Sequence, residues 1–218
     1  MFNQVKSPQF QYGYSQNQDY GCLVSVLSEK IDIEWLPQPS QPERQLSKQS
    51  ILTYAVPHSM IWRKIYFFPL TLNTEQIYAQ VIILLQQALP VALQDLQFDY
   101  QIQPLDQAYR VAVFALHKQF AQERQLSAYT RLDCELHCLA RAIHYLADLP
   151  LNTENEYAYP FGDQFVCFQR EACRIQPKLP ENLPLIMFEQ PQLPPNIIDR
   201  HLYLTALGAA LWNGTGSI

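Results

Sequence analysis

The stretch AVPHSMIWRKIYFFPLTLNTEQ, residues 55–76, carries two apolar runs and then enters a helix. Its β-branched and aromatic residues predict a strand over Ile61–Phe68, which ends at a proline. Asn73 is typical of a helix N-cap because its side chain can accept a hydrogen bond from a free backbone N–H. The apolar stripe that follows at helical spacing is Ile77, Val81, Leu84, Leu85 and Ala88. The stretch predicts a strand followed by a helix, and it contains no catalytic motif.

The composition predicts a globular protein with a thinly charged surface. The chain has 218 residues, of which 48% are hydrophobic and 16% are charged, and its formal net charge is -5. Such a chain can bury a sizeable core. Phosphate binding favours a basic face, so we expect protein partners rather than direct contact with nucleic acid.

The sequence predicts a cytoplasmic location. No apolar run approaches the roughly 20 residues that a helix needs to cross a bilayer. The N-terminal residues 1–18 are polar and lack the apolar centre of a signal peptide. The five cysteines are odd in number and irregularly spaced, which indicates free thiols in a reducing compartment.

Strands and helices alternate along the chain, which predicts an α/β or α+β protein. The predicted strands are Gln9–Tyr14, Tyr20–Leu27, Ile31–Trp35, Ile51–Val56, Ile61–Phe68, Leu96–Ile102, Val111–Leu116, Ala128–Leu132, Gln164–Phe168, Cys173–Ile175 and Leu185–Phe188. The predicted helices are Thr74–Leu89, Lys118–Gln125, Cys134–Ala147 and Asp199–Trp212.

Two cysteines and two histidines gather in the third predicted helix: Cys134, His137, Cys138 and His144. Their spacing is not that of a structural zinc site, and no second Cys/His pair follows at a suitable distance. We therefore predict that Cys134 and Cys138 are buried thiols without a metal. A Cys–His nucleophile pair stays open, because such partners meet only in the folded structure.

Phosphate-binding motifs are missing from the sequence. The chain has six glycines, and none of them forms a dinucleotide fingerprint or a P-loop. Arg63 and Lys64 alternate across the predicted strand Ile61–Phe68, and the simplest interpretation is a solvated strand face.

The segment from Tyr54 to Ile102 resembles the PilM family of pilus-assembly proteins. The markers of that resemblance, in order, are Ala55-Val56-Pro57, Pro69, Pro90 and Asp99-Tyr100. Two further segments, RLDCELHCLARAI (131–143) and LYLTALGAALW (202–212), are similar to two helices of the family. Strict matches cover about a third of the chain, and they are closest to the shortened competence branch called ComA or HofM.

The resemblance implies an α/β protein with the actin-like (RNase H-like) fold. It implies an intact first domain, residues 1–130, with an inserted subdomain at about 58–104, and a strongly shortened second domain, residues 131–218. Two interdomain helices are expected to cross at small residues, namely Ala140, Ala142, Ala206, Gly208 and Ala209. A mid-helix glycine costs about 1 kcal/mol against alanine, so Gly208 needs such a packing reason, and a leucine there should destabilise the protein.

The chain departs from the family pattern where the family binds nucleotide. The family's first strand runs into an Asp-x-Gly turn, whereas this chain has Tyr12-Gly13-Tyr14-Ser15 and no acidic residue before Asp19. Between the two crossing helices there is one glycine, Gly162, where full-length relatives carry glycine-rich loops. We expect that nucleotide binding is lost, that no cofactor is used and that the protein is not an enzyme.

The resemblance implies a cytoplasmic adaptor of a type IV pilus or DNA-uptake machine. Its expected partner is the N-terminal cytoplasmic tail of a PilN-like (ComB/HofN-type) inner-membrane protein, through which it would sit at the membrane. The predicted groove residues are Trp62, Tyr66, Phe68, Ile77 and Val81, with the helix covering the other face of the strand. Two alternatives stay open: an actin-like ATPase with an atypical site, and an unrelated cytoplasmic α/β binding protein.

Overall fold

The structure is a computed structural model that describes residues 10–27, 30–40, 42, 46, 50–124, 130–149, 156–169, 173–188 and 193–212. The chain forms two compact units. Unit 1 consists of Met1–Val56 and Ser127–Ile218, and unit 2 consists of Pro57–Leu126. Unit 2 contains the segment 58–104 that the sequence predicts as an insertion, and the domain division at residue 130 stays a prediction.

Unit 1 is built on a five-stranded sheet with the order β3-β2-β1-β4-β8. Its strands are β1 (Gln11–Gln16), β2 (Tyr20–Leu27), β3 (Lys30–Pro37), β4 (Ile51–Val56) and β8 (Thr130–Cys134). The first three pair antiparallel, while β4 lies parallel to both β1 and β8. Every residue of β4 is buried, as expected for a parallel strand covered on both faces.

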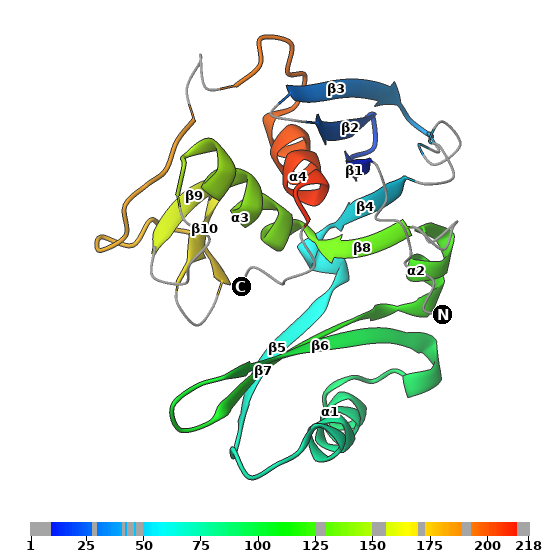
Figure 1. The fold of residues 1–218 in the computed structure, drawn as a ribbon, viewed down its shortest axis with the longest axis vertical. Coiled ribbons are helices and arrows are strands. Elements are labelled where there is room, and N and C mark those ends of the chain that lie inside the picture. The colour runs from blue at the N-terminus through cyan, green and yellow to red at the C-terminus, as the bar shows by residue number, and fades with distance from the viewer. Residues whose placement is uncertain are drawn as a thin grey trace, which may run out of the picture. The chain divides into compact units, whose positions relative to one another are not determined.

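Helix α4 (Arg200–Ala210) is the centre of unit 1. It packs against β1, β2 and β4, and against helix α3 (Glu135–Leu146) (Figure 1). A Cβ atom on Gly208 would lie 1.6 Å from the carbonyl oxygen of Cys138 in α3. A Cβ atom on Gly13 of β1 would lie 1.9 Å from the carbonyl oxygen of Ala206. The backbone of α4 therefore touches other backbone on two sides, and the predicted crossing residues Ala140, Ala142, Ala206 and Ala209 are all buried.

A buried ion pair accompanies the helix crossing. The guanidinium of Arg141 donates to the carbonyl oxygen of Gly208 at 2.8 Å and also binds the carboxylate of Asp133. Burial alone would raise the pKa of Asp133, but the hydrogen bond from His137 and the charge of Arg141 outweigh it and hold that pKa below its usual range. Asp133 is thus a carboxylate that keeps the buried cation neutralised.

A second, three-stranded sheet completes the described part of unit 1. Its order is β11-β10-β9, all antiparallel, with β9 at Tyr157–Phe161, β10 at Gln164–Phe168 and β11 at Cys173–Gln176. β9 is not among the strands that the sequence predicts. It contains Pro160 and lies at the edge of the sheet, where proline is tolerated. The predicted strand Leu185–Phe188 is wrong, because only an isolated parallel bridge between Leu185 and Ala158 forms there.

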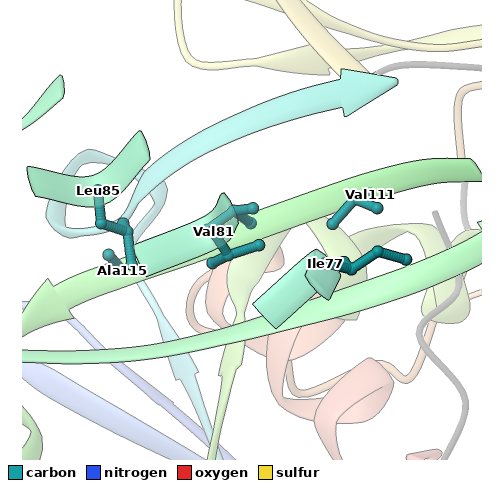
Figure 2. Packing of buried hydrophobic residues seen from close by; sticks show 6 residues of the cluster. Ile77, Val81, Leu85, Val111 and Ala115 are labelled. Atoms are coloured by element: carbon teal, nitrogen blue, oxygen red, sulfur yellow. The ribbon is translucent and has the colours of Figure 1, made fainter. Parts of the chain in front are cut away.

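Unit 2 is an antiparallel sheet covered on one face by a helix. The strands are β5 (Trp62–Phe68), β6 (Leu96–Pro104) and β7 (Tyr109–His117), in the order β5-β7-β6. Helix α1 (Thr74–Ala88) begins with the predicted cap at Asn73 and buries Ile77, Val81 and Leu85. These side chains lie along Val111 and Ala115 of β7 (Figure 2). The short helices η2 (His58–Met60), η3 (Leu93–Asp95) and α2 (Lys118–Arg124) complete the unit.

Within the described ranges, every helix is too short or too polar to cross a bilayer.

We predict that Gly208→Ala lowers the free energy of unfolding by about 3 kcal/mol or more, because the new methyl group would overlap the Cys138 carbonyl. The control is Gly162→Ala. A Cβ on Gly162 meets nothing within 4 Å, and its φ of +62° should cost only about 1–2 kcal/mol. Urea denaturation of both variants measures the difference. Equal losses would contradict the close crossing.

We predict that Asp133→Asn lowers the free energy of unfolding at pH 7 by about 3 kcal/mol, since it leaves the Arg141 charge buried and uncompensated. The folded-state pKa of Asp133 is depressed, so its contribution is complete above the unfolded pKa of about 3.9 and disappears as the pH falls through the folded value. The gap between wild type and variant should therefore narrow below about pH 4.

The control for that comparison is Asp32→Asn, which removes an exposed ion pair with Lys30. Exposed pairs contribute little, so this variant should unfold like wild type. A gap at Asp133 that is constant between pH 7 and pH 3 would argue against the charged role of its carboxylate.

Candidate functional site

The face of β5 that packs against α1 is not the face that the sequence predicts. Alternation places Trp62, Tyr66 and Phe68 on one face and Ile65 and Phe67 on the other. The first three pack against the core cluster formed by α1 and β7. The expectation that α1 covers the opposite face, and leaves Tyr66 and Phe68 open to a partner, is therefore wrong. Each face of the strand bears one cation and several large apolar groups, so alternation alone did not distinguish them.

The five predicted groove residues lie close together, but around the interior of unit 2. Ile77 and Val81 are buried in its core. Tyr66 and Phe68 are stacked with their ring centroids 6.4 Å apart, and Trp62 is half-buried beside the same cluster. Only the three aromatic residues retain surface that a ligand can touch, and their assignment to a partner groove stays a prediction.

The opposite face of β5 carries one strongly exposed aromatic side chain. Phe67 is 55% exposed, the largest exposed fraction among the apolar residues of this strand. Its neighbour across the sheet is Arg110 of β7, and Ile65 lies beside Ala112 in the same register. This face combines an exposed ring with aliphatic groups and a buried arginine.

A second aromatic cluster lies where α1 meets β6. The ring of Tyr78 lies 6.3 Å from the rings of both Phe98 and Tyr100, and Tyr78 is 48% exposed. The carboxylate of Asp99 accepts a hydrogen bond from the backbone N–H of Tyr100 at 2.8 Å. We call these four residues the α1–β6 surface. Sequence reasoning missed it because Tyr78 lies outside the apolar stripe of α1.

The β1–β2 turn lies where the family resemblance puts phosphate binding. Here the side-chain oxygen of Asn17 accepts hydrogen bonds from the backbone N–H groups of Asp19 and Tyr20, at 2.9 and 2.8 Å. The Asn17 amide also donates to the carboxylate of Asp199, the N-cap of α4. The backbone N–H groups of Asp19 and Tyr20, which could bind an anion, are thus already hydrogen-bonded within the turn, and the carboxylate of Asp199 lies beside it.

The cysteine and histidine cluster of α3 is part of the core. Cys134 and Cys138 are buried, as predicted. Burial raises the pKa of the Cys138 thiol well above its usual value, which disfavours a reactive thiolate. The His137 ring lies 3.4 Å from the Asp133 carboxylate. The described residues contain no group of three or more potential metal ligands, and the absence of a metal stays a prediction.

Comparison with known proteins yields structural matches only. No protein-family model matches the chain, and no curated protein matches it in sequence. The structure is similar to a chain of a "PilM-PilN type IV pilus biogenesis complex", with a TM-score of 0.55 and 14% identity over 76% of this chain and 61% of that one. This chain therefore spans less than two thirds of that protein's length.

A second match covers nearly the whole molecule. It is the cytoplasmic domain of EpsL, an inner membrane component of the type II secretion system of Vibrio cholerae. The TM-score is 0.56 and the identity 11%, over 94% of this chain and 95% of that one. These likenesses confirm the expected mixed α/β fold, which this chain shares with both proteins. The alternative of an unrelated cytoplasmic α/β binding protein concerns function and stays open.

We predict that Phe68→Ala and Phe67→Ala differ in their effect on stability, because the two side chains lie on opposite faces of β5. Phe68 packs against the core of unit 2, so its truncation should cost about 2 kcal/mol. Phe67 is largely exposed and should cost less than about 0.5 kcal/mol. Thermal unfolding of the two variants tests the assignment, and the reverse order would restore the original prediction.

Proposed function

We propose that the protein is a non-enzymatic cytoplasmic adaptor of a type IV pilus, DNA-uptake or type II secretion machine. It binds the N-terminal cytoplasmic tail of a PilN-like inner-membrane protein and is thereby held at the membrane. The observation that carries the proposal is the fold, which resembles both a chain of the PilM–PilN complex and the cytoplasmic domain of EpsL. The first belongs to a type IV pilus biogenesis complex, and EpsL is an inner membrane component of a type II secretion system.

The β1–β2 turn supports the non-enzymatic part of the proposal. A nucleotide phosphate needs free backbone donors and a metal held by carboxylates. In this chain Asn17 occupies the donors of the turn, and its amide bonds to Asp199. Asp199 is itself engaged as the N-cap of α4, since it accepts from the N–H of Leu202 at 3.0 Å. A phosphate would have to displace the bonds of Asn17 to reach the backbone N–H groups of Asp19 and Tyr20.

Unit 2 offers the chemistry that a peptide partner needs. It has exposed aromatic rings at Phe67 and Tyr78, and its described strands leave the edge of β6 unpaired. Aromatic anchors commonly dominate protein–peptide interfaces, each worth about 2 kcal/mol or more on truncation. We therefore assign partner binding to unit 2 and structural support to unit 1.

The binding experiment uses the full chain and a synthetic peptide of the N-terminal cytoplasmic tail of the PilN-like protein from the same organism. We expect a saturable complex in a fluorescence-anisotropy titration. A scrambled peptide of the same composition serves as the control for charge and apolar content. Absence of saturable binding, or equal binding by the scrambled peptide, would reject this partner.

A second measurement tests the alternative of an atypical ATPase. A ligand that binds only the folded state must raise its stability. We expect no shift in melting temperature with Mg-ATP at millimolar concentration, because the turn that should hold phosphate is already hydrogen-bonded. A reproducible rise that depends on ATP concentration would favour the ATPase.

A further inference from the structure

The outer edge of β6 presents backbone groups that the sheet does not use. β6 pairs with β7 along its whole length and is the last strand of the order β5-β7-β6. The N–H of Tyr100 bonds to the side chain of Asp99 rather than to β7, so it points away from the sheet. Residues two positions away share that direction, which places Phe98 and Ile102 on the same outer edge. Among the described residues, no backbone group pairs with this edge.

The side chains of the same three residues lie on the face that α1 covers. Phe98, Tyr100 and Ile102 pack against the core cluster of unit 2. The half-exposed ring of Tyr78 lies 6.3 Å from the rings of Phe98 and Tyr100 and adds an accessible apolar group beside β6. A strand added to β6 would pair with the backbone there and place every second side chain against Tyr78.

Within residues 65–109, the segment that holds α1 and β6, every charged residue is acidic, and the guanidinium of Arg110 on the neighbouring strand β7 donates to Gln103 of β6. The segment contains no lysine, arginine or histidine, and its acidic residues are Glu75, Asp95, Asp99 and Asp106. The side chain of Asp99 lies on the face of the sheet opposite to Phe98 and Tyr100, because neighbouring residues of a strand alternate. A cationic side chain of an added strand can therefore reach Asp99 while its apolar neighbours lie beside Tyr78.

We propose that β6 accepts an extended peptide in which Lys or Arg residues alternate with apolar ones, as a fourth strand of unit 2. Asp99 holds the N–H of Tyr100 while the edge is empty, and the cation of the incoming strand draws the carboxylate away. This step rests on the proposed function, because cytoplasmic segments next to a membrane anchor are rich in Lys and Arg. The alternative is that Asp99 only protects the edge from pairing.

The first test distinguishes strand addition from simple attraction. The probe is a fluorescein-labelled octapeptide of alternating leucine and lysine, in three forms: unmodified, N-methylated at all leucines, and N-methylated at all lysines. The N–H groups of alternate residues point to opposite edges of a strand, so only one methylated form should lose affinity, by at least tenfold. The other should bind within twofold of the unmodified peptide. Equal affinities or equal losses would overturn the proposal.

The second test locates the site. Tyr78→Ala and Asp99→Lys should each weaken binding of the unmodified octapeptide at least tenfold. The matched controls are Tyr20→Ala, which removes a 41% exposed tyrosine of unit 1, and Asp163→Lys, which reverses an exposed charge in the β9–β10 turn. Both controls should stay within twofold of wild type, with circular dichroism confirming that all four variants are folded. A loss at Asp163→Lys equal to that at Asp99→Lys would show nonspecific charge attraction and reject the site.

The two proposals can fail separately. If the native tail binds but Tyr78→Ala, Asp99→Lys and N-methylation leave that binding unchanged, the adaptor function stands and strand addition at β6 is wrong. If the native tail does not bind while the octapeptide behaves as expected, the β6 site stands and the identity of the partner is wrong.

Discussion

The fold of unit 1 depends on contact between backbones on two sides of helix α4. Gly208 lies against the carbonyl group of Cys138 in α3, and Gly13 of β1 lies against the turn of α4 that holds Ala206 and Ala209. A methyl group at either glycine would overlap atoms that cannot move without shifting a whole helix or strand. The layers of unit 1 are therefore held at distances that only glycine permits, although a glycine weakens the helix that carries Gly208.

Such close packing removes water from polar groups, and specific side chains replace it. The carbonyl of Gly208 is in the last turn of α4, where it lacks a partner within the helix, and the buried guanidinium of Arg141 donates to it. With its nitrogen turned toward α4, the amide of Gln11 donates to the carbonyls of Ala210 and Trp212 at 3.1 and 2.9 Å. Thr205 donates to the hydroxyl of Ser15 across the α4–β1 contact. Buried polar groups need hydrogen-bond partners, so the helix crossing requires polar side chains at some positions as well as small residues at others.

The sequence indicates these features to different degrees. The strands Tyr20–Leu27 and Ile51–Val56 and the cap at Asn73 follow from local patterns, and the structure has them at the predicted residues. Gly208 in α4 indicated a close helix crossing, because a mid-helix glycine weakens the helix unless close packing requires it. The sequence did not indicate the close contact of Gly13, because the α4 residues that it touches are distant in sequence. The covered face of β5 also depends on tertiary packing, because its two faces have similar composition.

The topology is compatible with the proposed assignment of structural support to unit 1 and of partner binding to unit 2. β4 and β8 are adjacent parallel strands in a fixed register, from Leu52 beside Thr130 to Val56 beside Cys134. Unit 2 is inserted between them, so its surface can change without altering the strands that α4 packs upon.

The backbone donors of the two units also differ in how they are hydrogen-bonded. In unit 1 two backbone donors of the β1–β2 turn are bonded to Asn17, whereas at the edge of β6 in unit 2 the N–H of Tyr100 is bonded to the exposed carboxylate of its neighbour Asp99. A backbone donor held by an exposed side chain can be released to a partner at little cost, and one held within a closed turn cannot.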